Sequence, residues 1–373
     1  VARMVISGYE YKNELPFKNV YLTGLVRDKN GKKMSKSLGN SPDPISLIEQ
    51  YGADGVRVGM LLCAPAGNDL PFDVALCEQG RNFANKIWNA FRLIKGWEVK
   101  DNEQPESAKQ AVIWLENKIN KAIDEINLSY SKYRISEALM STYKLIWDDF
   151  CSWYLEIIKP EYGSPIDSKT YSATITQLEN ILKLLHPFMP FLSEEIWHLI
   201  NTKEEDIIIS SWPDSGKIDN TLLENFDNIK EVIAGIRNIR KEKNIPNKDK
   251  LDLEFIDHQK QDHNLGPIIA KLGNLSSIQT ISKKPSNSFS FMVKSNEYFI
   301  PINETVDIKT EIEKLQKDLD YNKGFLKSVE NKLNNKKFVN NAPEQVVTNE
   351  KRKMSDIQEK IQILEEKIND LTK

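Results

Sequence analysis

The clearest regularity of the chain is a repeat of apolar positions, in alternating steps of four and three, near its carboxyl end. The apolar positions are Ile308, Ile312, Leu315, Leu319, Leu326, Val329 and Leu333, and then Met354, Ile357, Ile361, Leu364, Ile368 and Leu371. This spacing is typical of a coiled-coil seam, which the polar Asn322 interrupts. The stretch "NNKKFVNNAPEQ" between the two runs contains a proline, which cannot continue a helix. The pattern predicts an antiparallel coiled-coil hairpin over residues 304–373, with arms roughly 40 Å long that project from the body.

Residues 73–221 carry apolar positions three and four apart, which is the period of amphipathic helices. Asp73 can begin the first helix, and prolines separate the later ones, at Pro105, Pro160 and Pro187. Four or five long helices with short connections predict an antiparallel bundle. Three aromatic residues share these helical registers and are therefore expected in the core rather than free to stack on bases: Trp147, Trp153 and Tyr154.

A small α+β unit is predicted over residues 222–303, where the pattern changes from helical spacing to alternation. A helix through "ENFDNIKEVIAGIRNIRKEKNI" leads into "LDLEFI" at 251–256, which reads as a strand. Another short helix is expected before "FSFMVKS" and "EYFIPI", which are predicted to pair as a hairpin.

Residues 1–72 read as mixed α/β. "NVYLTGLV" at 19–26 is β-branched and apolar, which predicts a buried strand, and "DKNG" at 28–31 predicts a turn. Asp43 can cap a helix whose first position is Pro44, and Gly52 can end it. Asp54 is expected to cap the helix that follows.

Composition narrows the class of protein. The formal net charge of −3 over 373 residues means that any nucleic-acid binding must use local basic patches. The three cysteines are far apart and form no CxxC pair, which argues against a zinc module and favours a reducing cytoplasm: Cys63, Cys77 and Cys151. No apolar run is long enough to span a membrane. The amino end lacks an initiator methionine, so we expect the chain to be part of a larger protein.

The stretch "GKKMSKSLGN" at 31–40 combines two glycines with lysines and serines. It does not match the Walker A phosphate loop. A solvated hairpin tip is the ordinary interpretation, and a mobile loop that closes on phosphates is the functional one. Ammonium groups on such a loop can bind the charge that grows on leaving phosphates more strongly in the transition state than in the ground state.

The five residues Lys33, Met34, Ser35, Lys36 and Ser37 form an uninterrupted KMSKS signature, and the chain here resembles class I aminoacyl-tRNA synthetases. The resemblance implies that residues 1–72 are the end of a Rossmann-type nucleotide-binding domain. It further implies that the five residues bind ATP with its accompanying Mg²⁺. Lys36 would be the main transition-state residue and Lys33 would assist it.

Several longer stretches resemble the valyl-tRNA synthetase family in particular. They include "PAGNDLPFD" at 65–73, "LHPFMPFLSEEIWHLI" at 185–200, "IRNIRKEKNIP" at 236–246 and "NKLNNKKFVNNAPEQVVTNEKRK" at 331–353. The resemblance implies valine, ATP and tRNA(Val) as partners, an anticodon-binding role for residues 73–221, a tRNA-binding arm at 304–373, and a monomer. The His-Ile-Gly-His signature of the family is missing, so we expect no valine activation by these residues alone. No protein-bound metal is expected.

Basic residues in three places are candidates for tRNA contact. Arg81 and Lys86 open the bundle, where they can meet either tRNA or the catalytic body. Arg237 and Arg240 lie in a basic cluster that is either a solvated helix face or a contact with the tRNA backbone. Residues 323–353 hold eight basic and three acidic residues, a net charge of +5 that suits a phosphate-binding tip. The candidates there are Lys327, Lys332, Lys336, Lys337, Lys351, Arg352 and Lys353.

The sequence leaves other functions open. An isoleucyl-type synthetase is the close alternative, although enzymes of that type end in a cysteine-rich zinc module that the cysteine content here excludes. A non-catalytic tRNA-binding or assembly module could keep a vestigial loop. A coiled-coil scaffold protein would leave the KMSKS signature unexplained.

Overall fold

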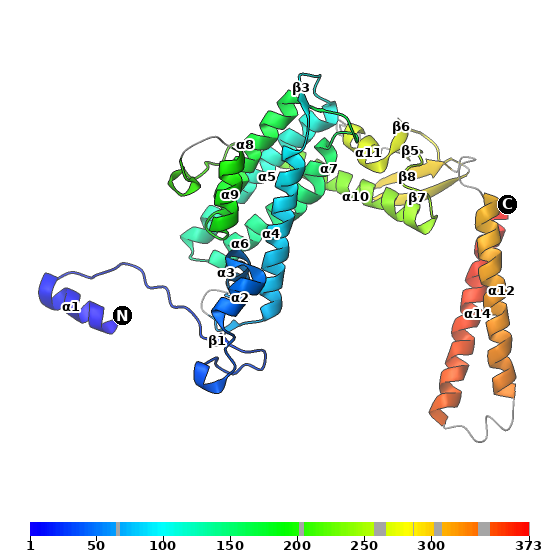
Figure 1. Ribbon diagram of the computed structural model, residues 1–373. Coiled ribbons are helices and arrows are strands. Elements are labelled where there is room, and N and C mark those ends of the chain that lie inside the picture. The colour runs from blue at the N-terminus through cyan, green and yellow to red at the C-terminus, as the bar shows by residue number, and fades with distance from the viewer. Residues whose placement is uncertain are drawn as a thin grey trace.

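The computed structural model describes residues 1–64, 68–200, 205–256, 266–285, 287–301, 308–334 and 344–372. It is a mainly helical molecule in which a helical bundle is followed by a small sheet and then by a pair of long helices (Figure 1). No helix in these ranges is both long enough and apolar enough to cross a membrane.

The amino-terminal part of the chain is loosely packed compared with the rest. Helix α1 (Ala2–Lys12) leads into an extended segment, and strand β1 is only Val26–Arg27, paired in parallel with β2 (Leu70–Pro71). The predicted buried strand at 19–26 is therefore wrong except at its last residue, and the side chains of Val20, Leu22 and Leu25 are exposed. A β-branched run becomes a strand only beside another strand, and among the described residues only β2 supplies one.

Helices α2 (Pro44–Tyr51) and α3 (Ala53–Leu62) follow the stretch at 31–40 that carries the KMSKS signature. Asp43 caps α2 by accepting a hydrogen bond from the Ser46 N–H, and Gly52 ends it at a φ of 77°, as predicted. Asp54 does not cap its own helix. Its carboxylate accepts from the N–H groups of Phe191 (3.4 Å) and Leu192 (2.7 Å), in the first turn of a different helix, α9 (Pro190–Ile200).

The predicted helical bundle is present. Asp73 caps the first helix by accepting from the Ala75 N–H, and the connections contain the three prolines named above. The bundle consists of α4 (Val74–Lys95), α5 (Glu106–Ser131), α6 (Ile135–Lys144), α7 (Leu155–Ile158), α8 (Ser168–Leu185) and α9 (Pro190–Ile200). Two short strands pair in parallel at one end, β3 (Val99–Lys100) and β4 (Ile166–Asp167).

A ten-residue π-helix, η2 (Leu145–Tyr154), joins α6 to α7 and was not predicted. Within it the Asp149 carboxylate pairs with Lys118 of α5 at 3.5 Å and with Lys230 of the later helix α10 (Asn220–Glu242) at 3.2 Å. Tyr154 is fully buried, whereas Trp147 and Trp153 are only partly buried. The expectation that the three rings belong to the core is thus confirmed fully for Tyr154 alone.

Helix α10 (Asn220–Glu242) belongs to two hydrophobic cores. Its first half packs in the bundle, where Phe226 stacks on Trp114 with ring centroids 3.9 Å apart. Its second half, through Val232, Ile236 and Ile239, covers one face of the small sheet. A side chain at Gly235 would collide with the ring of Phe291, so glycine allows this close approach.

The small sheet has four strands in the order β6-β5-β8-β7. Strand β5 (Leu251–Ile256) and the hairpin of β7 (Ser288–Val293) and β8 (Asn296–Pro301) were predicted, as was the short helix α11 (Gly266–Gly273). Strand β6 (Leu275–Thr280) was missed, because it lies at the sheet edge and its sequence "LSSIQT" is largely polar. Short 3₁₀ turns occur at η1 (Lys36–Leu38) and η3 (Ile207–Ile209).

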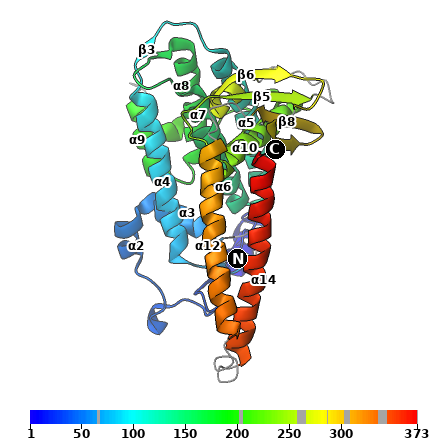
Figure 2. The same cartoon turned by 90° about the vertical axis from the view of Figure 1, so that its right-hand side faces the viewer.

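The chain ends in two long helices, α12 (Ile308–Asn334) and α14 (Glu344–Thr372), which lie side by side and run in opposite directions (Figures 1 and 2). Between them the side chains of Leu319, Val329, Ile357 and Leu364 are buried, as is Asn322. The Asn322 amide donates to the Asp318 carbonyl at 2.6 Å, so the polar interruption is bonded within its own helix. The pair extends away from the sheet (Figure 1).

We expect Asp54→Ala to loosen the junction between α3 and α9. The substitution leaves two backbone N–H groups at the start of α9 without their acceptor, which costs about 1–2 kcal/mol. Hydrogen exchange of the Phe191 and Leu192 amides should therefore rise roughly 5- to 30-fold. Asp43→Ala removes a cap of the same kind from α2 and should leave these two amides unchanged. Equal exchange in wild type and Asp54→Ala would show that Asp54 does not hold the junction.

Candidate functional site

The KMSKS signature lies on a short hairpin that β1 holds in place. The Met34 N–H donates to the Val26 carbonyl at 2.9 Å, and Arg27 and Lys33 form an antiparallel bridge. Gly31 closes the turn at a φ of 77°, a conformation that glycine adopts without strain. The Arg27 guanidinium donates to the Gly31 carbonyl at 3.1 Å and pairs with Asp69 beside β2. The hairpin is thereby fixed to the rest of the amino-terminal part.

Two polar side chains, Asp28 and Asn40, clamp the base of the loop. The Asp28 carboxylate accepts from the backbone N–H groups of Asn30 (2.9 Å) and Lys32 (3.0 Å) and from the Asn40 amide (3.0 Å). The Asn40 amide also donates to the Lys33 carbonyl at 3.2 Å, and its oxygen accepts from the Ser35 N–H at 3.0 Å. Asn40 therefore ties both sides of the signature to the turn that precedes it.

Within the signature, the apolar residue is anchored and a charged residue faces solvent. Met34 is partly buried against the small core that contains Leu47 and Phe72. Lys33 is exposed, and the hydroxyls of Ser35, just before the 3₁₀ turn η1, and Ser37, within it, lie 3.1 Å apart. The Lys36 backbone belongs to this turn, whereas its side chain lies outside the described part of the structure.

The carboxylates of this region stay ionised to low pH. The Asn40 amide, followed by the Lys32 N–H, lowers the pKa of Asp28. The Leu25 N–H, followed by Arg27, lowers the pKa of Asp69. Both folded-state pKa values lie below the ordinary aspartate pKa. The ionised carboxylates therefore contribute fully to the stability of the fold at any pH above the ordinary pKa, and this contribution is lost as the pH falls through the lowered folded-state pKa. The loop is therefore expected to keep its shape at neutral pH.

Sequence reasoning missed the roles of Asp28 and Asn40. A signal existed, since Asp28 opens the turn "DKNG" and aspartate in such turns bonds backbone N–H groups two residues on. Asn40 ends "SLGN", where nothing local indicates that its side chain reaches back to Asp28. Its importance appears only once the hairpin is folded.

Arg81 lies in the first half of α4 and Lys86 just past its middle, and both side chains have contacts. The Arg81 guanidinium pairs with Glu78 at 3.2 Å and lies over the Tyr51 ring of α2. The Lys86 ammonium lies 4.3 Å from the centre of the Trp147 ring and 3.5 Å from the Ser152 hydroxyl. Both side chains are only partly buried, so part of each cation still faces solvent.

The structure separates the two arginines of α10. Arg237 is exposed and lies over the Trp153 ring at 5.7 Å. Arg240 is 5% exposed, and its guanidinium donates to the carbonyls of Pro246 (3.0 Å), Gly273 (3.0 Å) and Asn274 (3.1 Å). The prediction of a tRNA contact for Arg240 does not agree with this burial. Arg240 instead holds the end of α10 to the sheet unit, and burial lowers the pKa of its guanidinium.

The basic candidates on the two long helices differ in their exposure and in whether they form ion pairs. Lys327, Lys351 and Arg352 are exposed. Lys353 pairs with Glu350 at 2.8 Å, and Lys332 of the facing helix approaches the same carboxylate at 3.9 Å. These neighbours lower the pKa of Glu350. Lys336 and Lys337 lie outside the described residues. The stacked rings of Tyr321 and Phe325, which the sequence analysis passed over, are exposed on α12.

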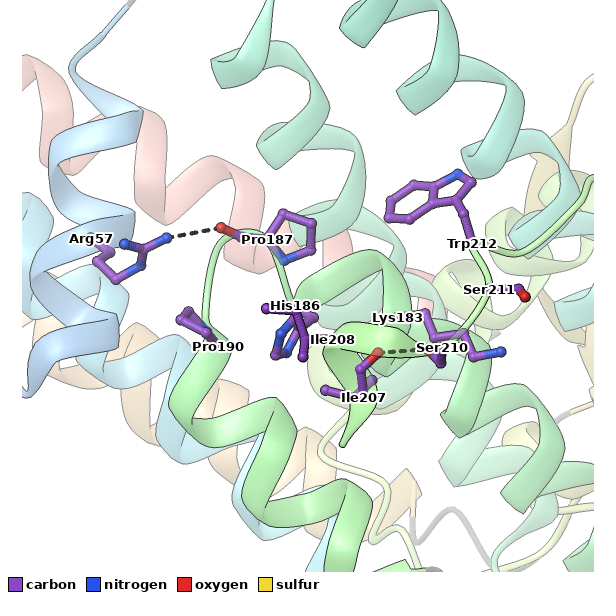
Figure 3. A pocket seen from close by; sticks show the side chains of 10 residues that line it. All are labelled: Arg57, Lys183, His186, Pro187, Pro190, Ile207, Ile208, Ser210, Ser211 and Trp212. Carbon is purple, nitrogen blue, oxygen red and sulfur yellow. Dashed lines mark hydrogen bonds between the residues drawn. The ribbon is translucent and has the colours of Figure 1, made fainter. Parts of the chain in front are cut away.

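The predicted residues thus lie on separate elements rather than in one pocket. The signature loop lies at one end of the bundle, Arg237 lies on α10, and α12 and α14 lie beyond the sheet (Figure 1). Arg237, Arg240 and Lys241 line a cavity of about 750 Å³ where α10 meets the sheet unit. Another cavity, of about 390 Å³, is bounded by Arg57, His186 and Trp212 and contains none of the predicted residues (Figure 3).

Three family models match the chain. Residues 1–73 match class I tRNA synthetases (I, L, M and V), residues 113–255 match the anticodon-binding domain of tRNA ligase, and residues 307–372 match the valyl tRNA synthetase tRNA binding arm.

Whole-chain relatives are similar over all of these residues. "Valine--tRNA ligase" of Christiangramia forsetii is 56% identical, that of Parabacteroides distasonis 52% and that of Fervidobacterium nodosum 36%, each over 100% of this chain. The chain spans 43% of the length of each of these relatives. A solved LeuRS-tRNA-LeuAMS complex from Agrobacterium radiobacter K84 aligns with a TM-score of 0.42 at 16% identity, over 76% of this chain and 35% of that one. The relatives favour the valyl type over the isoleucyl alternative.

We expect Asn40→Ala to loosen the signature loop without unfolding the chain. The substitution removes the acceptor of the Ser35 N–H and one donor to Asp28, a loss of about 1–3 kcal/mol if the groups stay unpaired. Hydrogen exchange of the Ser35 amide should rise accordingly. Asn30→Ala is the matched control, because Asn30 bonds Asp28 through its backbone N–H. If both variants exchange alike, Asn40 does not organise the loop.

Proposed function

The chain belongs to the valyl-tRNA synthetase family, and from this premise we propose that it acts as the carboxyl-terminal part of a valine–tRNA ligase. The reaction is the ATP-dependent activation of valine and its transfer to tRNA(Val). The observation that carries the proposal is the uninterrupted KMSKS signature on a clamped hairpin, in a chain whose relatives are valine–tRNA ligases over their matched length.

We propose a division of the chain into four parts. Residues 1–72 are the end of the catalytic domain, with its Rossmann-type fold, and residues 73–221 are the anticodon-binding bundle. Residues 222–303 are the junction unit, and residues 304–373 are a coiled-coil tRNA-binding arm. The two cores that share α10 support the second and third parts, and the buried seam between α12 and α14 supports the fourth. The free cysteines Cys63, Cys77 and Cys151 suit work in the cytoplasm, and we propose a monomer.

The loop has the chemistry to assist amino-acid activation. In that reaction a carboxylate attacks the α-phosphorus of ATP, and negative charge grows on the departing pyrophosphate. Lys33 and Lys36 can bind this charge, since lysine acts as a compact and mobile cation. Met34 anchors the loop in the core while Lys33 stays at the surface, so the loop can move without losing its base. ATP arrives with its Mg²⁺, and Ser35 and Ser37 supply hydroxyl groups to the phosphates.

Binding of tRNA is proposed to use exposed cations on three elements. The candidate cations that are exposed are Arg237 on α10 and Lys327, Lys351 and Arg352 on the arm. Arg81 and Lys86 on α4 are partly exposed. Lys332 and Lys353 belong to the same surface although they share Glu350. Lys336 and Lys337 remain candidates on the basis of the sequence alone. Contacts of this kind recognise phosphates and 2′-hydroxyl groups, and therefore the shape of a folded RNA.

In the full-length enzyme, Lys36→Ala should slow valine-dependent ATP–pyrophosphate exchange by roughly 10²–10³, the scale for losing one preorganised transition-state donor. The affinity for valine should barely change. Lys32→Ala is the matched control, because Lys32 is also exposed and positive but lies outside the signature. Exchange within a few-fold of wild type for Lys36→Ala would remove the loop from the catalytic step.

Reversing the charge of Lys351 and Arg352 on the arm should weaken tRNA binding and flatten its salt dependence. Fewer counterions are released when fewer phosphates are neutralised, so the slope of log K against log [salt] should fall by about 0.7–0.9 for each lost contact. The measurement is tRNA affinity at several salt concentrations. ATP–pyrophosphate exchange should be nearly unchanged, because activation does not need these contacts.

The matched control is Lys317→Glu with Lys360→Glu, which makes the same change of net charge away from the basic distal half of the arm. Both residues are exposed on the same two helices. Weaker binding only for the distal pair supports a local contact with RNA. Equal weakening by the distal pair and the control pair would mean that tRNA binding depends on net charge and not on the distal half of the arm. If the salt dependence of the distal-pair variant superimposes on that of the wild type, the arm does not bind tRNA.

A further inference from the structure

Three metal-ligating side chains come together on α9 and the segment that follows it. Glu194 and His198 are one helical turn apart on α9, and Asp206 comes from the segment just before η3. The His198 Nε2 atom lies 3.1 Å from the Glu194 carboxylate and 3.2 Å from the Asp206 carboxylate. One donor atom from each residue lies within 4.8 Å of the others. No sequence motif indicated this cluster, and the sequence analysis expected no protein-bound metal.

The two separations measured from the His198 Nε2 atom suit ligands of one metal ion, and the two carboxylates lie within 4.8 Å of each other. With metal–ligand distances near ~2.1 Å, two ligands at right angles are about 3.0 Å apart, and two at a tetrahedral angle are about 3.4 Å apart. The two measured separations, 3.1 and 3.2 Å, fall between these values. Glu194 is partly buried, whereas His198 and Asp206 are exposed, which leaves room for water to complete the coordination.

Bonds around the cluster hold its members in position. The Ile207 N–H donates to the Glu194 carboxylate at 2.9 Å, which orients this side chain toward His198. The Trp197 indole N–H donates to the Glu205 carbonyl at 3.1 Å and so fixes the backbone next to Asp206. Partners that orient ligands in this way are a regular feature of metal sites.

A cavity of about 500 Å³ opens beside the cluster and provides access to it. Glu194 and His198 line this cavity, together with His186, Glu195 and Ile208. The cavity thus brings solvent to two of the three donor side chains. It is an observation separate from the donor spacing, and it shows that an ion could enter.

We propose that Glu194, His198 and Asp206 form a site for one divalent transition-metal ion. An imidazole nitrogen with two carboxylate oxygens favours zinc, manganese, iron(II), cobalt or nickel over calcium and magnesium, which prefer oxygen ligands alone. The ion would tie the segment after α9 to the helix. That segment also forms one wall of the 390 Å³ cavity, through Ile207, Ser210 and Trp212 (Figure 3), so the wall would be fixed as well.

A protonated His198 that pairs with both carboxylates would explain the same contacts without a metal, and zinc titration separates the two. The 373-residue chain, freed of metal by chelator and kept reduced, is titrated with zinc chloride at neutral pH by calorimetry. We expect the wild type to bind one zinc ion at this site. His198→Ala and Glu194→Gln should each lose this ion or bind it about 10- to 100-fold more weakly. Magnesium should not compete. Zinc should also slow hydrogen exchange of the Ile207 amide in the wild type alone.

Glu195→Gln is the matched control, because Glu195 is the adjacent carboxylate of α9 and is not among the three donors. It should bind zinc within about twofold of wild type. If circular dichroism shows that a helix variant has unfolded, Asp206→Asn removes the third ligand without touching α9. Identical zinc binding in wild type and His198→Ala, or equal weakening by Glu195→Gln and Glu194→Gln, would overturn the site and leave an ion pair only. This result would not affect the proposed ligase function, which does not rest on the site.

Discussion

Helix α10 is the element on which the arrangement of the molecule depends, because its two halves are buried in different cores. Phe226 stacks on Trp114 inside the bundle, while Val232, Ile236 and Ile239 cover the sheet. A continuous helix transmits orientation, so the sheet unit cannot turn relative to the bundle without exposing one of these apolar sets to water. Two polar contacts hold the same helix: Lys230 near its middle pairs with Asp149 of the π-helix, and Arg240 near its carboxyl end donates to three backbone carbonyls.

A second junction connects the signature loop to the bundle. Helices α3 and α4 approach so closely that a side chain at Gly59 or Gly80 would collide with the backbone of the facing helix. From α3, Asp54 accepts from the Leu192 N–H in the first turn of α9, and Arg57 donates to the Pro187 carbonyl in the turn before it. Burial raises the pKa of Asp54, and the two N–H groups and Arg57 oppose this shift. The loop base, the bundle and the sheet therefore form one connected body from which the signature residues and the arm extend.

This arrangement fits the function proposed above, which combines binding of a large RNA with assistance to chemistry on a small substrate. The loop combines an anchored Met34 with an exposed Lys33, so its base is fixed while this cation faces solvent. Among the described side chains of α12 and α14, apolar residues are buried between the helices, and the Glu350 carboxylate contacts one lysine from each helix. If the arm binds RNA as proposed, the exposed rings of Tyr321 and Phe325 on α12 can add stacking contacts to those of the cations.

Periodic and capping signals in the sequence predicted the bundle, the two long helices, the sheet hairpin and the caps at Asp43 and Asp73, because each depends on residues a few positions apart. The KMSKS signature likewise needs only five consecutive residues. Tertiary structure alone decided the rest. Among the described residues, the apolar run at 19–26 pairs only with the short strand β2, and only at its last residue. Asp54 bonds N–H groups 137 and 138 residues away in the sequence. Arg240 is buried and donates to backbone carbonyls instead of facing solvent. Glu194, His198 and Asp206 meet only because a segment folds back on α9. A hydrogen bond or a ligand set between distant segments depends on where the chain returns, which local sequence does not specify.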